Sequence, residues 1–289
     1  MSIATAPSTI DTASFEYVRK LVLDRSSIAL ESTKGYLVES RLTPLARKQG
    51  LANVGELVAV LRRTPYGQLH DQVVDAMTTN ETSFFRDLAP FEVLKTSILP
   101  ELIGRRSTRR ALNIWSAACS SGQEMYTIAI VLREHFPQLA TWKVRIFATD
   151  LCQEMLQRAA AGVYSQAEVN RGLPAPYLVK YFERNGLQWI AKPELRQMMT
   201  VQRLNLTESW AAVPTMDVVF MRNVLIYFVP ETKKLILGKV HRQLASDGTL
   251  LLGGAETTLG LDDRFARVPS GKTTIYRPSA AIGLAPAAV

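Results

Sequence analysis

The spacing of apolar residues divides the chain into two halves with different patterns. From residue 14 to about 78, apolar positions recur every three or four residues, as they do on one face of an amphipathic helix. Four such faces follow one another: Phe15, Val18, Leu21 and Val22; Val38, Leu42 and Leu45; Val54, Leu57, Val58 and Leu61; and Leu69, Val73, Ala76 and Met77. We therefore predict an all-helical N-terminal domain over residues 14–78.

Polar and proline residues indicate where these helices begin or bend. Asn53, with Glu56 three residues later, resembles a capping box. Thr64 followed by Pro65 suggests a second helix start, with proline at the first helical position. Because Pro44 lies inside the second pattern, we expect that helix to kink or break there.

The second helix also carries cations at a regular spacing. Lys34, Arg41 and Lys48 recur every seven residues, and Arg47 lies beside the last of them. If the helix reaches that far, this spacing gives one cationic stripe along it. The alternative is an ordinary charged face in contact with solvent, and the residues alone favour that interpretation.

From about residue 105 the pattern changes to short apolar runs that alternate with helical segments. The runs are 111–116, 144–149, 216–221 and 249–253, the last after a turn at Asp247-Gly248, and the helical segments are 122–136, 152–161 and 230–244. This alternation predicts an α/β domain over 105–278, in which helices cover both faces of a mostly parallel sheet. Residues 164–202 interrupt it with loop formers, so we expect a small inserted subdomain there. Residues 79–104 form the linker, and the Ala, Pro, Ser and Thr-rich ends, 1–13 and 279–289, are expected to be loose tails.

Composition narrows the class of protein. With 47% hydrophobic and 21% charged residues, the chain is typical of a soluble globular protein. It has neither a signal-peptide pattern nor an apolar run near the ~20 residues needed to cross a bilayer, so we expect a cytoplasmic protein without membrane insertion. Two cysteines, Cys119 and Cys152, suit a reducing compartment, and His70, His135 and His241 lack metal-ligand spacing, so no metal is expected. The net charge of +8 leaves nucleic acid, anionic membrane and an acidic protein as candidate partners.

Three features coincide where the predicted parallel strands end, which is where open α/β sheets bind ligands. The first strand leads into the small-residue turn 117–122, the second ends in Asp150, and the third ends in Arg222-Asn223. Asp150 is placed to accept hydrogen bonds from ribose hydroxyls, although an acid at this position is often only a helix cap. The turn has one glycine rather than a glycine-rich loop, which disfavours a pyrophosphate ligand. An adenosine ligand without phosphates fits better, and S-adenosylmethionine is the common one.

Four segments together resemble the CheR family of chemoreceptor glutamate O-methyltransferases. They are TTNETSFFRD (78–87), IWSAACSSGQEMYTIAI (114–130), FATD (147–150) and RNVLIYF (222–228), and the resemblance covers residues 14–277. It implies a small helical domain followed by a doubly wound, Rossmann-like class I methyltransferase domain that depends on S-adenosylmethionine and carries an inserted β-subdomain. The product would be S-adenosylhomocysteine, and the partner would be the coiled-coil cytoplasmic domain of a methyl-accepting chemoreceptor.

The resemblance also implies roles for individual residues. Those expected to contact the cofactor are Asn80, Thr82, Arg86, Glu124, Asp150, Asn205, Leu206, Asn223 and Val224. Arg86 and Tyr227 match positions beside the reacting methyl group and are the expected catalytic residues. Arg222 receives no role beyond that of an ion-pair partner. Given an acidic coiled coil as partner, we expect Arg41, Arg47 and Lys48 to face the receptor, and the enzyme to be a monomer.

The chain departs from the family pattern in two places. The second motif commonly reads GEEPY, whereas residues 122–126 read GQEMY and keep the second glutamate, Glu124. The segment between Tyr181-Phe182 and Asn205 is shorter than in members whose β-subdomain grips a receptor's C-terminal pentapeptide. Such tethering is therefore in doubt for this chain, while catalysis is not.

The chemistry of carboxylate methylation agrees with the residues present. A glutamate side chain, with a pKa near 4.3, is already ionised at neutral pH, so no strong general base is required. Two rival functions have some support: a nucleic-acid methyltransferase, from charge and cofactor, and a non-catalytic module that binds cofactor or receptors. The last motif lacks the Asn/Asp-Pro-Pro-Tyr of amino-group methylation, and retention of the whole residue set argues against a decayed enzyme. A nicotinamide dehydrogenase is a distant third because the glycine-rich turn is missing.

Overall fold

The computed structural model describes residues 10–279, and these residues form two compact units. Unit 1 contains the residues up to Thr79 together with Tyr227–Val229, and unit 2 contains Asn80–Ile226 and the residues from Pro230 onward. The tails expected at 1–13 and 279–289 lie mostly outside the described residues. Residues 12 and 13, however, already belong to the first helix, because the Asp11 side chain caps it by accepting a hydrogen bond from Ser14 N at 2.8 Å.

Unit 1 is helical, as the apolar spacing predicts. Its elements are α1 (Thr12–Ser26), the 3-10 turn η1 (Ser32–Lys34), α2 (Gly35–Lys48), α3 (Val54–Arg63) and α4 (Gln68–Met77). The four apolar faces meet in one core, in which Val18, Val22, Val38, Leu42 and Leu57 are completely buried. Burial of each such side chain contributes roughly 1.5–3 kcal/mol, and this is the main reason that short helices are stable here.

Two local predictions for unit 1 need correction. Of the kink or break expected at Pro44, the break is absent: α2 continues to Lys48, because its buried face carries on through Ala46. α4 begins at Gln68 rather than at Pro65. Thr64 closes α3 instead of opening α4, since its backbone N–H and its hydroxyl both donate to Val60 O. The capping interaction at Asn53 is confirmed: its side chain accepts from Glu56 N at 3.0 Å.

Unit 2 is built on a seven-stranded sheet with the strand order β6-β2-β1-β7-β8-β10-β9. The strands are β1 (Ala111–Ala117), β2 (Lys143–Asp150), β6 (Met199–Arg203), β7 (Met216–Met221), β8 (Leu244–Leu252), β9 (Phe265–Ser270) and β10 (Thr273–Pro278). The first five pair in parallel, and β10 pairs antiparallel with both β8 and β9. This is the doubly wound α/β arrangement expected from the alternating pattern.

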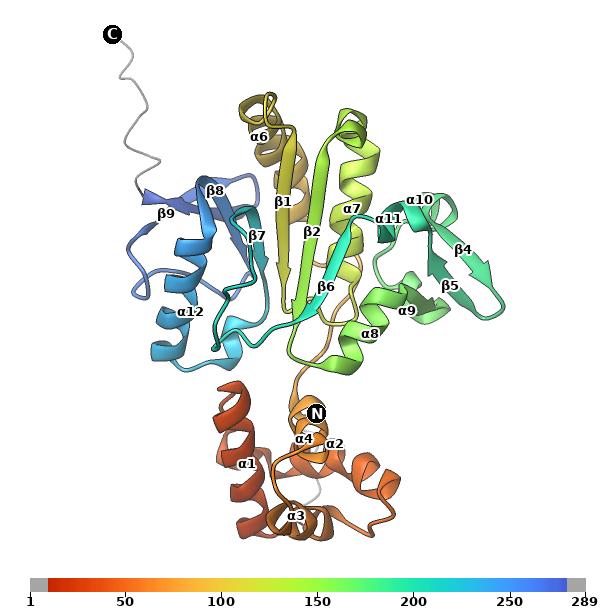
Figure 1. Ribbon diagram of the computed structural model, residues 1–289, viewed down its shortest axis with the longest axis vertical. Helices are drawn as coiled ribbons and strands as arrows, with labels where there is room; N and C mark the ends of the chain where they lie inside the picture. Colours follow the sequence, from red (N-terminus) through yellow and green to blue (C-terminus); the bar gives the residue numbers. More distant parts are fainter. Residues whose placement is uncertain (1–9, 280–289) are drawn as a thin grey trace, which may run out of the picture. The chain divides into compact units, whose positions relative to one another are not determined.

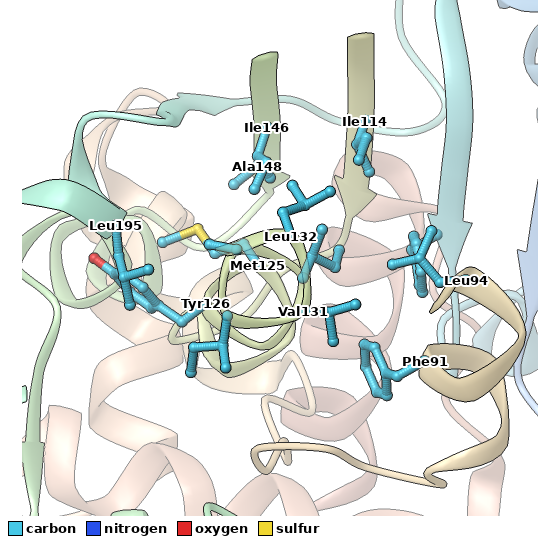
Figure 2. Close-up of a cluster of buried hydrophobic side chains, with 14 of the residues drawn as sticks. Phe91, Leu94, Ile114, Met125, Tyr126, Val131, Leu132, Ile146, Ala148 and Leu195 are labelled. Atoms are coloured by element: carbon cyan, nitrogen blue, oxygen red, sulfur yellow. The ribbon is translucent and has the colours of Figure 1, made fainter. Parts of the chain in front are cut away.

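Eight α-helices and three shorter helical segments accompany this sheet within the described part of unit 2. They are α5 (Ala89–Val93), η2 (Leu94–Ile98), α6 (Leu99–Arg105), α7 (Gln123–His135), η3 (Pro137–Thr141), α8 (Gln153–Ala161), α9 (Gln166–Asn170), α10 (Ala175–Tyr181), α11 (Pro193–Arg196), η4 (Leu225–Tyr227, whose last residue groups with unit 1) and α12 (Pro230–Gln243). Figure 2 shows α7 beneath the sheet, with Met125 and Leu132 toward Ile114 of β1 and Ile146 of β2. α7 is therefore the central helix of the core on this face.

The segment expected to be a linker, 79–104, is largely helical. α5, η2 and α6 run on without interruption from Ala89 to Arg105. Phe91, Leu94, Ile98 and Leu102 are buried from this run, at the three- and four-residue spacing of a helix face. The segment is thus part of the unit 2 core rather than a connection between domains.

The inserted β-subdomain is present but smaller than 164–202. β3 (Val163–Ser165), β5 (Gln188–Ala191) and β4 (Phe182–Asn185) form a separate antiparallel sheet in that order. In Figure 1 this small sheet lies beyond β6, next to α9 and α10. β6 itself, which falls inside the expected range, pairs with β2 in the main sheet through Ile146 and Met199.

One strand boundary also differs from expectation. Asp247-Gly248 is not a turn that precedes the last predicted strand, because β8 already begins at Leu244. The pairing with β7 jumps between Met216, opposite Leu244, and Val218, opposite Thr249. The residues between form a bulge in β8, and the local turn signal of Asp-Gly marks that bulge.

Candidate active site

β1 lies at the switch point of the parallel sheet, because it pairs with β2 on one side and with β7 on the other. The chain leaves β1 for β2 in one direction and later returns to β7 in the other. The carboxyl ends of these three strands therefore frame the crevice where doubly wound sheets bind ligands. The turn 117–122, Asp150 and Arg222-Asn223 all lie at this edge, as the sequence predicts.

The turn after β1 has an unusual backbone that places its N–H groups toward β2. Ala118 and Ser120 have φ of 60° and 50°, and Gly122 has φ of 96°. Cys119 N donates to Thr149 O at 2.9 Å, and Ser120 N donates to the Asp150 carboxylate at 2.8 Å. Positive φ is unfavourable for these two residues because each has a Cβ atom. Such strained backbone is found where a chain must come close to a ligand.

Asp150 closes the floor of the crevice and is only 7% exposed. Its two oxygens each accept one backbone N–H, from Ser120 and from Cys152 at 2.9 Å. Burial raises the pKa of this carboxyl above its usual range, although the backbone hydrogen bonds oppose the shift. A carboxylate has about four acceptor positions, so these two hydrogen bonds do not exhaust its capacity.

Glu124, in the first turn of α7, is held by residues from both neighbouring strands. Its Oε1 accepts from the Ser116 hydroxyl at 2.7 Å, and its Oε2 pairs with Arg222 Nη1 at 2.8 Å. Arg222 also donates to Arg86 O at 2.7 Å and to the Asp87 carboxylate at 2.9 Å. Arg222 is thus the ion-pair partner that the sequence suggested, and it joins the end of β7 to both the first turn of α7 and the 80–87 segment.

The 80–87 segment is fastened to the same edge by its backbone. Ser120 Oγ donates to Asn80 O at 2.7 Å, and Phe85 N donates to the Thr127 hydroxyl of α7 at 3.1 Å. The Arg86 guanidinium is partly exposed and donates to Glu81 O at 2.8 Å. Asn80 and Thr82 also line a cleft of about 280 Å³, together with Ser121, Gln123 and Arg158.

Asn205 and Leu206 follow β6 and reach the same region through β2. Leu204 N donates to the Asp150 backbone carbonyl at 2.9 Å. The Asn205 side chain accepts from both the N–H and the hydroxyl of Thr207, at 3.1 and 2.9 Å, and Leu206 is buried. This hydrogen-bonded loop places both residues directly beyond the end of β6, next to Asp150.

Asn223 and Val224 form a tight turn after β7, and a carboxylate from the loop after β8 holds this turn. Asn223 has φ of 58°, and its N–H donates to Glu256 at 2.8 Å, while Val224 N donates to the same carboxylate at 2.9 Å. Sequence reasoning missed Glu256. The signal was the Gly253-Gly254 pair and the acid that follow a predicted strand.

The residues expected to face a receptor lie in unit 1 and divide into two kinds. Arg41 donates to Met77 O, Thr78 O and the Thr79 hydroxyl at 2.7–3.0 Å, and burial lowers its pKa. Arg47 and Lys48, in the last turn of α2, are exposed and make no ion pair with any residue of 10–279. Arg41 therefore anchors the end of α4, and the free cations of the stripe are Arg47 and Lys48.

Tyr227 ends the 3-10 turn that follows Asn223 and belongs to unit 1 by its contacts. Its carbonyl accepts from Ala29 N at 3.3 Å. Its expected place beside the reacting methyl stays a prediction.

Three general features of residues 10–279 concern membrane spans, metal ligands and cysteines. Across residues 10–279, no helix combines the length and apolar character needed to span a membrane. Within the same range, no three His, Cys, Asp or Glu side chains are grouped so that they could hold a metal ion. Cys119 and Cys152 are both buried as free thiols, and burial raises the pKa of Cys119 well above its usual range.

Comparison with known proteins agrees with this geometry over almost the whole chain. Residues 80–274 match the SAM-binding domain of CheR methyltransferases, and residues 13–78 match the all-alpha domain of the same proteins. Chemotaxis protein methyltransferase 1 of Pseudomonas aeruginosa is 44% identical over 270 residues, which cover 92% of this chain and 97% of the relative. Chemotaxis protein methyltransferase Cher2 of Pseudomonas putida is 42% identical, with 91% and 97% covered, and a Vibrio parahaemolyticus relative is 38% identical, with 93% and 98% covered. The chain is therefore an S-adenosylmethionine-dependent methyltransferase and belongs to the CheR family.

Proposed function

We propose that this enzyme transfers a methyl group from S-adenosylmethionine to glutamate side-chain carboxylates of chemoreceptors, in the cytoplasm and as a monomer. The products are glutamate methyl esters and S-adenosylhomocysteine, and the reaction serves adaptation in chemosensory signalling. The observation that carries the proposal is the convergence of Glu124, Asp150 and Asn223 at one sheet edge, in a chain whose relatives are named chemotaxis protein methyltransferases.

The cofactor-binding residues are proposed from this geometry and from the family resemblance. Asp150 offers its carboxylate to the ribose hydroxyls, and the 205–206 loop and Asn223-Val224 flank the same crevice. Glu124 and the 80–86 segment close it from the side of α7. The Arg222 ion pair fixes the orientation of the Glu124 side chain in the first turn of α7.

The transfer itself requires little acid or base chemistry. S-adenosylmethionine supplies a methyl group activated by its positive sulfonium sulfur. A carboxylate oxygen forms a bond to the methyl carbon while the carbon–sulfur bond breaks and its electron pair returns to sulfur. The acceptor carboxylate is ionised at neutral pH, so the residues have to align three atoms rather than remove a proton.

Arg86 and Tyr227 are assigned to that alignment. Both charges disappear during the transfer, because the carboxylate becomes an ester and the sulfonium becomes a thioether. A strongly polar site would stabilise the charged ground state more than the transition state. We therefore assign orienting roles to the Arg86 guanidinium, which is partly exposed, and to the Tyr227 hydroxyl.

The receptor surface is assigned to the exposed end of α2. A chemoreceptor coiled coil is acidic, and opposite charge accelerates encounter in a salt-dependent way. Arg47 and Lys48 are exposed and unpaired within 10–279, so they are available to such a partner. Arg41, which the sevenfold spacing of cations grouped with them, contributes by fixing the end of α4.

Transfer of labelled methyl groups tests this function. The enzyme is incubated with methyl-tritiated S-adenosylmethionine and either a chemoreceptor cytoplasmic domain or tRNA, and each product is then treated with alkali. We expect label on the receptor that alkali releases as methanol, because esters are alkali-labile and methylamines are not. Label on tRNA alone, or label on the receptor that resists alkali, would overturn the proposal.

A further inference from the structure

The Glu256 carboxylate accepts four backbone hydrogen bonds. Its Oε2 accepts from Gly253 N at 2.7 Å and from Asn223 N at 2.8 Å. Its Oε1 accepts from Val224 N at 2.9 Å and from Leu225 N at 2.6 Å. Three successive backbone N–H groups of one turn thus converge on a single anion, which is the geometry of an anion-binding nest.

The turn that Glu256 holds cannot satisfy these donors by itself. Asn223 is in the left-handed region, with φ of 58°, so the backbone leaves the extended path of β7 abruptly. Each of the three N–H groups points toward β8 instead of into a helix or strand ladder. Without the carboxylate they would lack a protein acceptor, and the turn would relax toward another conformation.

The neighbouring strand is built to bring the carboxylate this close. Gly253 follows β8, and a Cβ atom placed on it would lie 2.7 Å from Glu256 Oε2 and 2.9 Å from Asn223 N. Any side chain at Gly253 would therefore push the Asn223-Val224 turn away from the loop that carries Glu256. Glu256 N donates back to Gly253 O at 2.9 Å, and Tyr276 of β10 donates its hydroxyl to Glu256 O at 3.4 Å.

We propose that Glu256 is the positioning residue that sets the conformation of the Asn223-Val224 turn and thereby the affinity for S-adenosylmethionine. The inference rests on the proposed role of Asn223 and Val224 in cofactor binding and adds a residue to which neither the resemblance nor the comparisons assign a role. Glu256 acts through the backbone N–H groups and does not touch the reacting atoms. Its replacement changes cofactor binding more than the chemical step.

The surroundings of Glu256 permit a test by chemical rescue. Glu256 lines a cavity of about 430 Å³, together with Gly254, Arg267, Lys272 and Thr274. Arg267 and Lys272 are exposed cations that draw anions toward it. A small carboxylate such as acetate therefore has a route to the position that the Glu256 side chain vacates in an alanine variant.

The experiment measures binding of S-adenosylhomocysteine by calorimetry in the full chain and in three variants. For Glu256→Ala we expect the Kd to rise roughly tenfold to a hundredfold, as for the loss of hydrogen bonds to one charged group. Sodium acetate should restore part of the affinity, whereas sodium chloride at the same concentration should not. Glu256→Gln keeps the size but turns an NH₂ group toward two N–H donors, so its Kd should rise as well. Asp263→Asn, which changes an exposed carboxylate whose side chain makes no hydrogen bond or ion pair within 10–279, should bind like the unmodified protein.

Turnover separates positioning from a general structural role. The KM for S-adenosylmethionine should rise in Glu256→Ala, while kcat at saturating cofactor changes by less than about threefold. A folded Glu256→Ala or Glu256→Gln protein whose Kd stays within about twofold would overturn the inference, as would rescue by chloride as effective as rescue by acetate. Failure of the unmodified protein to bind S-adenosylhomocysteine would instead overturn the proposed function.

Discussion

Arg222 Nη1 lies 2.8 Å from Glu124 Oε2, in an ion pair whose side chains expose only 2% and 12% of their surface. The pair ties the end of β7 to the first turn of α7. The same guanidinium holds Asp87 and the Arg86 carbonyl, so one buried cation organises three segments of the candidate site.

Removal of this cation should be costly. Arg222→Ala leaves the buried Glu124 carboxylate and the Arg86 carbonyl without their partner, and we expect a loss of about 3–5 kcal/mol in the free energy of unfolding. Urea denaturation measures this loss. Arg184→Ala, which removes an exposed arginine from β4, should cost less than about 0.5 kcal/mol. A loss below about 1 kcal/mol for Arg222→Ala would show that the pair does not organise the site.

Arg86→Ala should have the opposite profile, with a large loss of activity and a small loss of stability. The side chain makes one hydrogen bond, to Glu81 O, which is worth about 0.5–1.5 kcal/mol. We expect kcat/KM to fall by about 100-fold or more, which corresponds to about 2.7 kcal/mol of transition-state stabilisation. Methyl-transfer rates and thermal denaturation measure the two effects.

Arg133→Ala is the matched control, because Arg133 is an exposed arginine that also donates to one backbone carbonyl, that of Glu194. It should lose stability to a similar extent and keep its activity. The assignment of Arg86 fails if Arg86→Ala unfolds the protein, or if its turnover equals that of Arg133→Ala.

Charge reversal at the end of α2 tests the receptor surface. We expect Arg47→Glu and Lys48→Glu each to raise the KM for receptor and to weaken its dependence on salt, while the affinity for S-adenosylhomocysteine stays the same. KM values measured over a range of sodium chloride concentrations provide the test. Arg63→Glu, an exposed cation in the last turn of α3, controls for net charge. Equal salt profiles for all three variants and the unmodified enzyme would return the stripe to an ordinary solvated face.

Stability at low pH should depend on Asp247, which lies in the β8 bulge. Hydrogen bonds from Arg106 lower the pKa of this carboxyl from 3.8 to about 2. Because the folded pKa is the lower one, the contribution to stability is complete above the unfolded pKa and is lost as the pH falls through about 2.

Urea denaturation between pH 6 and pH 2 measures this contribution, with the range chosen to span both pKa values. The difference in unfolding free energy between the unmodified protein and Asp247→Asn should be largest near pH 6 and should shrink as the pH falls below about 4. A difference that does not change with pH would mean that the Arg106–Asp247 pair contributes nothing through protonation.

The sequence alone predicted the parts of the fold whose pattern is local. Met216–Met221, apolar except for Asp217, is β7 without adjustment, and the helix predicted at 122–136 is α7 within one residue at each end. The N-terminal helices followed from their 3.6-residue period. The site was predicted in outline because parallel strands end at one edge, so Asp150 and Asn223 had to come together once the strands were recognised.

What the sequence did not show depends on pairing between distant segments. The hydrogen bond from Asn223 N to Glu256 requires the end of β8 to lie beside the end of β7. That arrangement includes a bulge that shifts the register of β8, and no local signal specifies the shift. Likewise, β6 has too few apolar residues to be recognised as a strand of the main sheet, and only its pairing with β2 places it there. Arg222 was expected to be an ion-pair partner, but its partners could not be named because they lie 98 and 135 residues away along the chain.

The most direct test of the central claim is a crystal structure of the full chain with S-adenosylhomocysteine. We predict that the ribose hydroxyls lie within hydrogen-bonding distance of the Asp150 carboxylate and that the adenosine is flanked by the 205–206 loop and Asn223-Val224. A ligand bound elsewhere on the protein, with the crevice beyond β1, β2 and β7 empty, would contradict the account.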